Sequence, residues 1–177
     1  MGTTNRNVFT DACIYIGGND CFGKASKVTP PSIKYGKHEI KDLGTIGAMN
    51  LPNGKINDAL ECTITLNSFY PDIFKKIANP FKAVDLKVYS NFTEFENDDA
   101  TGNVGTKLFL RGSSQEFGLL GEQNQHDNMD YEMKFDLTMA RLVVDNKELY
   151  YIDIPNNVFI IDGVDVRKDI VKNLGLV

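Results

Sequence analysis

Apolar and polar residues alternate with a period of two along much of the chain. The most regular examples are residues 60–67 and 131–140, in which every second position is apolar. A strand with one buried and one solvated face has this period, because successive side chains point to opposite faces of the sheet. Parallel strands, which are buried on both faces, would not alternate, so the pattern predicts an antiparallel sheet.

Helix signals are confined to two short segments. Pro71 occupies a favoured first helical position and predicts a helix that runs to about Ala78. A second helix is expected near the C-terminus, with Asp165 as its N-terminal cap and Gly175 as its end. Turns are predicted at Gly17-Gly18-Asn19-Asp20, Asp145-Asn146-Lys147, Pro155-Asn156-Asn157 and Asp162-Gly163. The expected fold is therefore mainly β, an antiparallel β-sandwich or barrel with one or two short helices.

Length and charge narrow the classes of protein that remain. The 177 residues, 42% of them hydrophobic, suffice for one core, so residues 1–177 are expected to form a single domain. A net charge of −5 argues against a general nucleic-acid binder, which needs a basic excess to replace phosphate counterions. The polar N-terminus lacks a signal core, and no run approaches the roughly 18 apolar residues of a membrane span. A soluble chain made in the cytoplasm, without membrane anchoring, is expected.

No residue pattern indicates catalysis, a metal site or a cofactor. Cys13, Cys21 and Cys62 include no Cys-x-x-Cys pair, and reduced structural thiols are expected. His38 and His126 stand far apart and have no neighbouring cysteine or repeated carboxylate spacing. Residues 97–102 are similar to the start of a calcium loop, but the twelfth position holds leucine where a bidentate glutamate is required. An exposed acidic turn is the expected structure there.

The C-terminal segment carries a resemblance to a known family. Ile152-Asp153-Ile154-Pro155-Asn156-Asn157, then Asp162-Gly163-Val164-Asp165, then a helix ending in Leu174-Gly175-Leu176-Val177 resemble the C-terminus of the major tail tube proteins of contractile-tailed bacteriophages. Residues 54–66, followed by Tyr70-Pro71-Asp72-Ile73-Phe74, are similar to the central strand and short helix of that family. Weaker similarities lie at residues 28–31 and 110–112.

The resemblance implies a structural subunit and not an enzyme. It implies homohexameric rings whose sheets join into a continuous inner β-barrel, and rings that stack into a hollow tube inside a contractile sheath. The tube would be the conduit for DNA ejection, with DNA in transit only and without specific binding. The implied partners are further copies of the chain, the tail sheath protein, and the tape-measure, baseplate and tail-terminator proteins. The implied location is the virion tail, assembled in the cytoplasm of the host bacterium.

Two other functions stay open on the sequence alone. The same fold could serve a phage-derived contractile bacteriocin or injection system that carries no genome, and neighbouring capsid and terminase genes would distinguish a phage. A small-ligand binding or enzymatic β-domain is the more remote alternative, because a fold by itself supplies no site. Observation of a filament by electron microscopy would exclude that alternative.

Residues 38–57 are expected to form contacts between subunits and between stacked rings. The glycines at 44, 47 and 54, together with Pro52, predict a flexible, irregular loop. Its large apolar side chains would be costly to leave in water, so a partner is expected to bury them. These residues are Leu43, Ile46, Met49 and Leu51.

The polar faces of the strands at residues 61–67 and 132–140 are expected to line the lumen. These strands alternate most cleanly, and the resemblance places the strand after Gly54 in the inner barrel. The alternative is that both faces meet bulk water or the sheath, since alternation marks any half-solvated antiparallel sheet. The lumen candidates are Glu61, Thr63, Thr65, Glu132, Lys134, Asp136 and Thr138.

Overall fold

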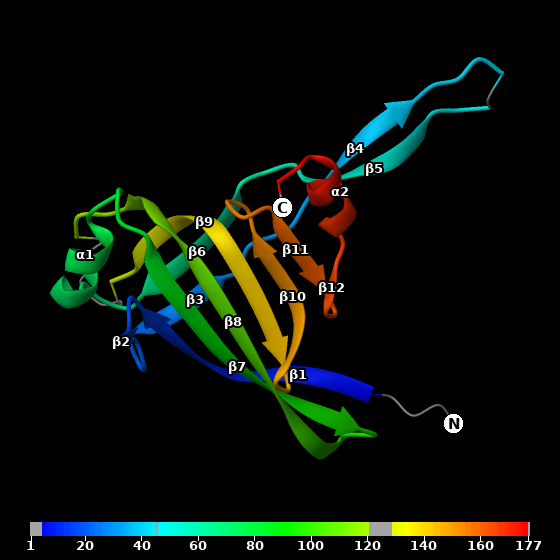
Figure 1. The fold of residues 1–177 in the computed structure, drawn as a ribbon. Coiled ribbons are helices and arrows are strands. Elements are labelled where there is room, and N and C mark those ends of the chain that lie inside the picture. Colours follow the sequence, from blue (N-terminus) through cyan, green and yellow to red (C-terminus); the bar gives the residue numbers. More distant parts are fainter. Residues whose placement is uncertain (1–4, 45, 121–128, 177) are drawn as a thin grey trace.

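The computed structural model describes residues 5–44, 46–120 and 129–176, and within these ranges the chain is mostly antiparallel β-structure (Figure 1). The strands are β1 (Asn5–Ile16), β2 (Asn19–Asp20), β3 (Ala25–Thr29), β4 (Tyr35–Ile40), β5 (Met49–Ile56), β6 (Leu60–Leu66), β7 (Val84–Glu96), β8 (Asp99–Phe117), β9 (Tyr131–Val144), β10 (Lys147–Asp153), β11 (Val158–Ile161) and β12 (Val164–Asp165). The helices are α1 (Pro71–Ile77) and α2 (Lys168–Asn173). The predicted antiparallel fold with two short helices is confirmed.

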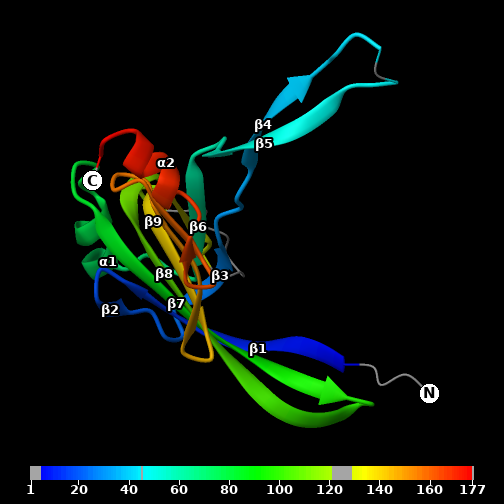
Figure 2. The ribbon, with the colours of Figure 1, turned by 45° about the vertical axis from the view of Figure 1, so that its right-hand side comes forward.

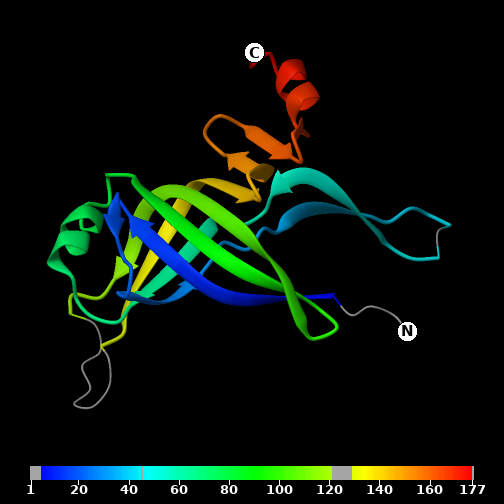
Figure 3. The ribbon, with the colours of Figure 1, turned by 90° about the horizontal axis from the view of Figure 1, so that it is seen from below.

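Strand β9 connects the parts of the main sheet. The order is β12-β11-β10-β9-β8-β7-β1-β2, and β6 pairs with both β9 and β3. One edge of β9 pairs with β8, whereas the other edge pairs first with β6 from Tyr131 to Leu137 and then with β10 from Met139 to Val144. The sheet curls, so that β3 and β1 approach each other. Figure 3 shows the curled sheet from below, with α1 at one end.

The core lies on the concave side of this curled sheet. Leu60, Ile64 and Phe135 are completely buried, and the other apolar residues of the two alternating segments up to Leu137 are at most 5% exposed. Helix α1 covers one end and contributes Ile73 and Ile77. These residues occupy the apolar positions that the period of two marks, because burial is what selects one face of each strand.

A β-bulge interrupts the alternation of β9. The pairing of β8 with β9 shifts between Arg111 and Gly112. Beyond this shift Ala140 is buried and Met139 is only half-buried. The prediction that the polar face of the strand extends to Ala140 is therefore wrong, because an inserted residue exchanges the two faces of all that follows.

The predicted irregular loop at residues 38–57 is a regular antiparallel hairpin, and that prediction is also wrong. Strands β4 and β5 pair only with each other within the described chain, and together with residues 41–44 and 46–48 they form a long projection that we call the arm (Figure 2). Pro52 fits within β5 because each strand of an isolated hairpin has a free edge, where a proline breaks no ladder bond. Gly54 has a positive φ of 68° and lies where the register between β4 and β5 shifts. Gly44 takes a positive φ of 88° in the connection.

Of the two predictions for the ends of the C-terminal helix, one is confirmed and the other is wrong. Gly175, with a φ of 67°, follows the last turn of α2 as predicted. Asp165, by contrast, does not cap α2, because its Oδ1 accepts a hydrogen bond from the backbone nitrogen of Arg167, the residue that precedes the helix. It stabilises the turn before α2 instead.

Gly112 is the residue that permits the bulge, and it provides a test of the architecture. A Cβ added at this position would overlap the carbonyl oxygen of Asp136 on the paired strand. We expect Gly112→Ala to lower the free energy of unfolding by about 3 kcal/mol, the upper range for overpacking, because backbone atoms cannot move aside. Urea denaturation of the soluble subunit measures the change.

Gly105→Ala is the matched control on the same strand. A Cβ at Gly105 meets nothing within 4 Å, and the residue has no positive φ. We expect this variant to unfold at nearly the wild-type urea concentration. Equal destabilisation of the two variants would contradict the role assigned to the bulge.

Candidate assembly surfaces

The predicted lumen residues lie together on one face of the sheet. In the ladder between β6 and β9, Glu61 is opposite Asp136, Thr63 is opposite Lys134, and Thr65 is opposite Glu132. Paired residues share a face, so the two segments form one surface, which we call the polar face. It consists of Glu61, Thr63, Thr65, Glu132, Lys134, Asp136 and Thr138, with Glu116 from β8 added by the structure.

The members of the polar face differ in exposure. Glu61, Glu132 and Thr138 are exposed, whereas Lys134 and Asp136 are half-buried. Thr65 is only 9% exposed, so it contributes little to the surface. Thr138 marks the end of the polar face, because its hydroxyl bonds to the carbonyl oxygen of Arg111 at 3.3 Å beside the bulge.

Three carboxylates of the polar face act on one ammonium group. Lys134 Nζ lies 2.9 Å from Glu116 Oε2 and 3.8 Å from Glu132 Oε1. The hydrogen bond to Glu116 raises the pKa of Lys134, and the charges of Glu116, Glu132 and Glu61 act in the same direction. The lysine therefore stays protonated at neutral pH, and acidic groups outnumber it. Lys27 of β3, opposite Thr65, adds a second cation at the border.

The arm is a second surface, and its base is firmly attached to the body. Tyr35 Oη and Tyr150 Oη are 2.7 Å apart, and the Tyr35 ring stacks on Phe159 with ring centroids 6.2 Å apart. Burial and this hydrogen bond raise the pKa of Tyr150, so the phenol stays neutral. Arg167 Nη1 donates to the carbonyl oxygen of Gly54 at 3.1 Å from the other side.

Beyond this base the arm exposes the residues expected to contact a partner. Leu43 and Ile46 are fully exposed, and Met49 and Leu51 are 53% and 43% exposed. All four belong to one hairpin that projects away from the core in each view of the ribbon. The structure thus places the four together but does not show what covers them.

Two further surfaces were missed by the sequence reasoning. The first is an apolar groove of about 910 Å³ between β1 and β3, which depends on the curl of the sheet. The second is a three-stranded extension formed by residues 5–10, 91–96 and 99–105, beyond the end of β9. Only the unusual length of the alternating segment in β7 and β8 could have indicated this extension.

The described residues show no arrangement for metal binding. They contain no group of three or more histidine, cysteine, aspartate or glutamate side chains that could hold an ion. His126 lies outside the described residues, and His38 is exposed on the arm. Among the described helices none is long and apolar enough to cross a membrane.

Comparison with known proteins identifies the kind of assembly. Residues 6–175 match the family described as phage tail tube protein FII. The chain belongs to this family. It is a structural subunit of a phage tail tube, and the resemblance seen in the sequence is confirmed.

The proteins to which this tail tube protein is similar include a curated relative and a solved structure. It is 26% identical to the tail tube protein of Escherichia phage P2 over 165 residues, which cover 92% of this chain and 94% of the relative. The solved structure is that of Hcp1 from Flavobacterium johnsoniae, with 13% sequence identity and a TM-score of 0.44. That similarity covers 77% of this chain and 96% of Hcp1.

The three thiols of the tail tube protein give a test of the described core. Cys62 is completely buried, and burial raises its pKa to about 12, whereas Cys13 is only half-buried. Because the thiolate is the reactive form, Cys62 should resist iodoacetamide at pH 8 while Cys13 is alkylated. Peptide mass spectrometry of native protein should show this order, and urea should abolish the difference. Rapid native labelling of Cys62 would contradict the packing.

Proposed function

We propose that six copies of the chain form a ring, that the polar faces of the six sheets line its bore, and that stacked rings form the tube through which phage DNA leaves the particle. Joined sheets leave no strand edge open to unwanted pairing. Head-to-tail contacts between identical rings can continue without limit, so another component must set the length of the tube.

The observation that carries this proposal is the acidic polar face on a sheet whose opposite side is the core. DNA passing through a channel must not adhere to its wall. A lining rich in lysine and arginine would bind phosphates and hold the strand, whereas excess carboxylates prevent this. Glu116, Glu132 and Lys134 form a closed ion-pair cluster, which leaves no free ammonium at the centre of the face.

The arm supplies the contact between subunits. Burying one large apolar side chain contributes about 1.5–3 kcal/mol, and each arm exposes the four side chains that were expected to meet a partner. A two-stranded hairpin is at best marginally stable in water by itself, so docking would also stabilise the arm. We assign Leu43, Ile46, Met49 and Leu51 to this contact.

The remaining partners follow from a position inside a contractile tail. The outer surface of the ring contacts the tail sheath protein, and the ends of the tube contact baseplate and tail-terminator proteins. A tape-measure protein occupies the bore until ejection. Subunits are made and assembled in the host bacterial cytoplasm and end in the virion tail, and the tube has no catalytic role.

The first test of assembly replaces two arm residues. Ile46→Asp together with Met49→Asp should abolish rings and tubes, because docking would then bury two carboxylates without partners. Both side chains are exposed in the isolated subunit, so circular dichroism should show an unchanged β-fold. Negative-stain microscopy and light scattering measure the loss of assembly against wild-type protein.

Phe81→Asp is the control for this pair. Phe81 is 98% exposed and follows α1, at the opposite end of the subunit from the arm. This variant should still assemble. If the arm variant forms normal tubes, the arm is not the contact. If wild-type protein stays monomeric at high concentration, the proposed tube itself is wrong.

The second test changes the charge of the polar face. Glu61→Lys together with Glu132→Lys should permit tail assembly but slow DNA ejection, because each of six subunits would add cations to the bore. The defect should lessen as salt rises, since the Debye length falls from about 10 Å at 0.1 M to about 3 Å at 1 M. DNA release from triggered particles at several ionic strengths measures it.

The control is Glu96→Lys together with Asp99→Lys, which makes the same change of charge away from the polar face. These residues are paired at the exposed turn between β7 and β8, away from the polar face. Particles with this change should eject DNA at the wild-type rate. Wild-type ejection from the Glu61 and Glu132 variant at low salt would place these strands away from the bore.

A further inference from the structure

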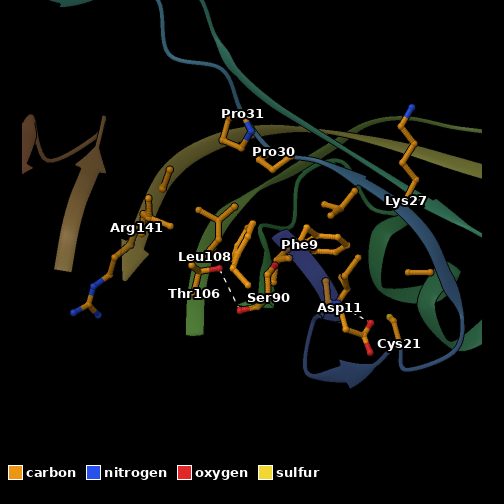
Figure 4. Close-up of a pocket in the computed structure, with 18 of the residues that line it drawn as sticks. Phe9, Asp11, Cys21, Lys27, Pro30, Pro31, Ser90, Thr106, Leu108 and Arg141 are labelled. Carbon is orange, nitrogen blue, oxygen red and sulfur yellow. Dashed lines mark hydrogen bonds between the residues drawn. The ribbon is translucent and has the colours of Figure 1, made fainter. Parts of the chain in front are cut away.

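The apolar groove lies where the curled sheet fails to close. One wall is β1, with Phe9 and Ala12, and the other is the segment from Lys27 to Pro31 (Figure 4). Its floor is formed by apolar side chains of the central strands, among them Val88, Leu108 and Leu142. A hydrogen bond from the Cys21 nitrogen to the Ile14 carbonyl oxygen, 2.9 Å long, closes one end of the gap.

Both walls have strand edges without a partner. Within the described chain β1 pairs along one edge with β7, and along the other only Tyr15 and Ile16 pair with β2. Strand β3 pairs only with β6. The residues of β1 from Phe9 to Ala12 and the outer edge of β3 therefore present backbone donors and acceptors beside an apolar cavity, which is an arrangement suited to receive an extended segment.

The arm has the complementary properties. It is an extended hairpin with two free edges and four exposed apolar side chains, whereas the groove has free edges and an apolar floor. The arm cannot fill the groove of its own subunit, because its base is held by Tyr35 and Arg167 and its tip projects away from the body. In an assembly of identical chains, every subunit offers one arm and one groove.

Charges at the rim agree with this pairing. Asp11, on the β1 wall, forms no ion pair in the described structure, and neither does Lys37 nor Lys55 on the arm. An arm that enters the groove brings unpaired ammonium groups to the wall that carries the unpaired Asp11 carboxylate.

We propose that the groove between β1 and β3 is the docking site for the arm of a second copy of this chain. The inference rests on the proposed assembly into rings and tubes, and it assigns the acceptor for the arm. Docking buries the apolar tip of the arm on the floor formed by Val88 and Leu108, and the edges of β1 and β3 gain backbone partners.

The experiment uses two preparations of the full chain, each in a Cys13→Ser background. One carries Met49→Cys on the arm, and the other carries Ala12→Cys in the groove. After mixed assembly, a short bismaleimide should link them into a dimer that peptide mass spectrometry assigns to positions 49 and 12. The matched control replaces Ala12→Cys by Glu132→Cys on the polar face, which should give no dimer with position 49.

A second variant tests the groove without cysteines. Ser90 lines the groove, so Ser90→Phe should fill part of it and abolish tubes while leaving the melting temperature of the subunit unchanged or raised. Tubes that form normally from Ser90→Phe protein, or links from position 49 that favour the polar face, would overturn the assignment and leave the tube intact. A small apolar molecule found in the groove of assembled tubes would also overturn it. Wild-type protein that never forms rings would instead refute the proposed function.

Discussion

The pairing of β9 with three strands is the constraint on which the rest of the structure depends. Its first half joins β6 and its second half joins β10 along one edge, while β8 pairs along the other. The change of partner on one edge coincides with a bulge in the ladder on the other edge, opposite Gly112, where the absence of a side chain lets the two backbones approach.

The part of β9 before the bulge and the part after it belong to two different surfaces of the subunit. On the β6 side, apolar and polar residues alternate and produce a polar face backed by the core. On the β10 side, the sheet turns away and carries the C-terminal strands, whose Tyr150 and Phe159 hold the base of the arm. The surface assigned to the bore and the attachment of the contact arm thus depend on the same interruption.

The isolated subunit is incomplete in a way that fits polymerisation. Apolar residues are left exposed on the arm, and an apolar groove is left open where β1 and β3 do not meet. Burial of these apolar surfaces in an assembly would raise the free energy of unfolding of the subunit, because a partner that binds only the folded chain stabilises it.

The sequence alone determined the antiparallel class, both helices, the main turns and the polar positions of the two strands that form the polar face. These features are local, because a period of two, a proline at a helix start and an Asp-Gly or Asn-rich turn act within a few residues. The family resemblance rested on such local segments too. The alternating residues around Ile64 and Phe135 identified the core for the same reason.

Only the tertiary structure decided the features that depend on contacts distant in sequence. The burial of Ala140 follows from a bulge set by Gly112 on another strand, and nothing near residue 140 indicates it. Residues 38–57 look irregular in isolation, yet they form a hairpin because Tyr35 and Gly54 are anchored by residues more than one hundred positions away. The groove arises from the curl of the whole sheet, and side-chain periodicity carries no information about curvature.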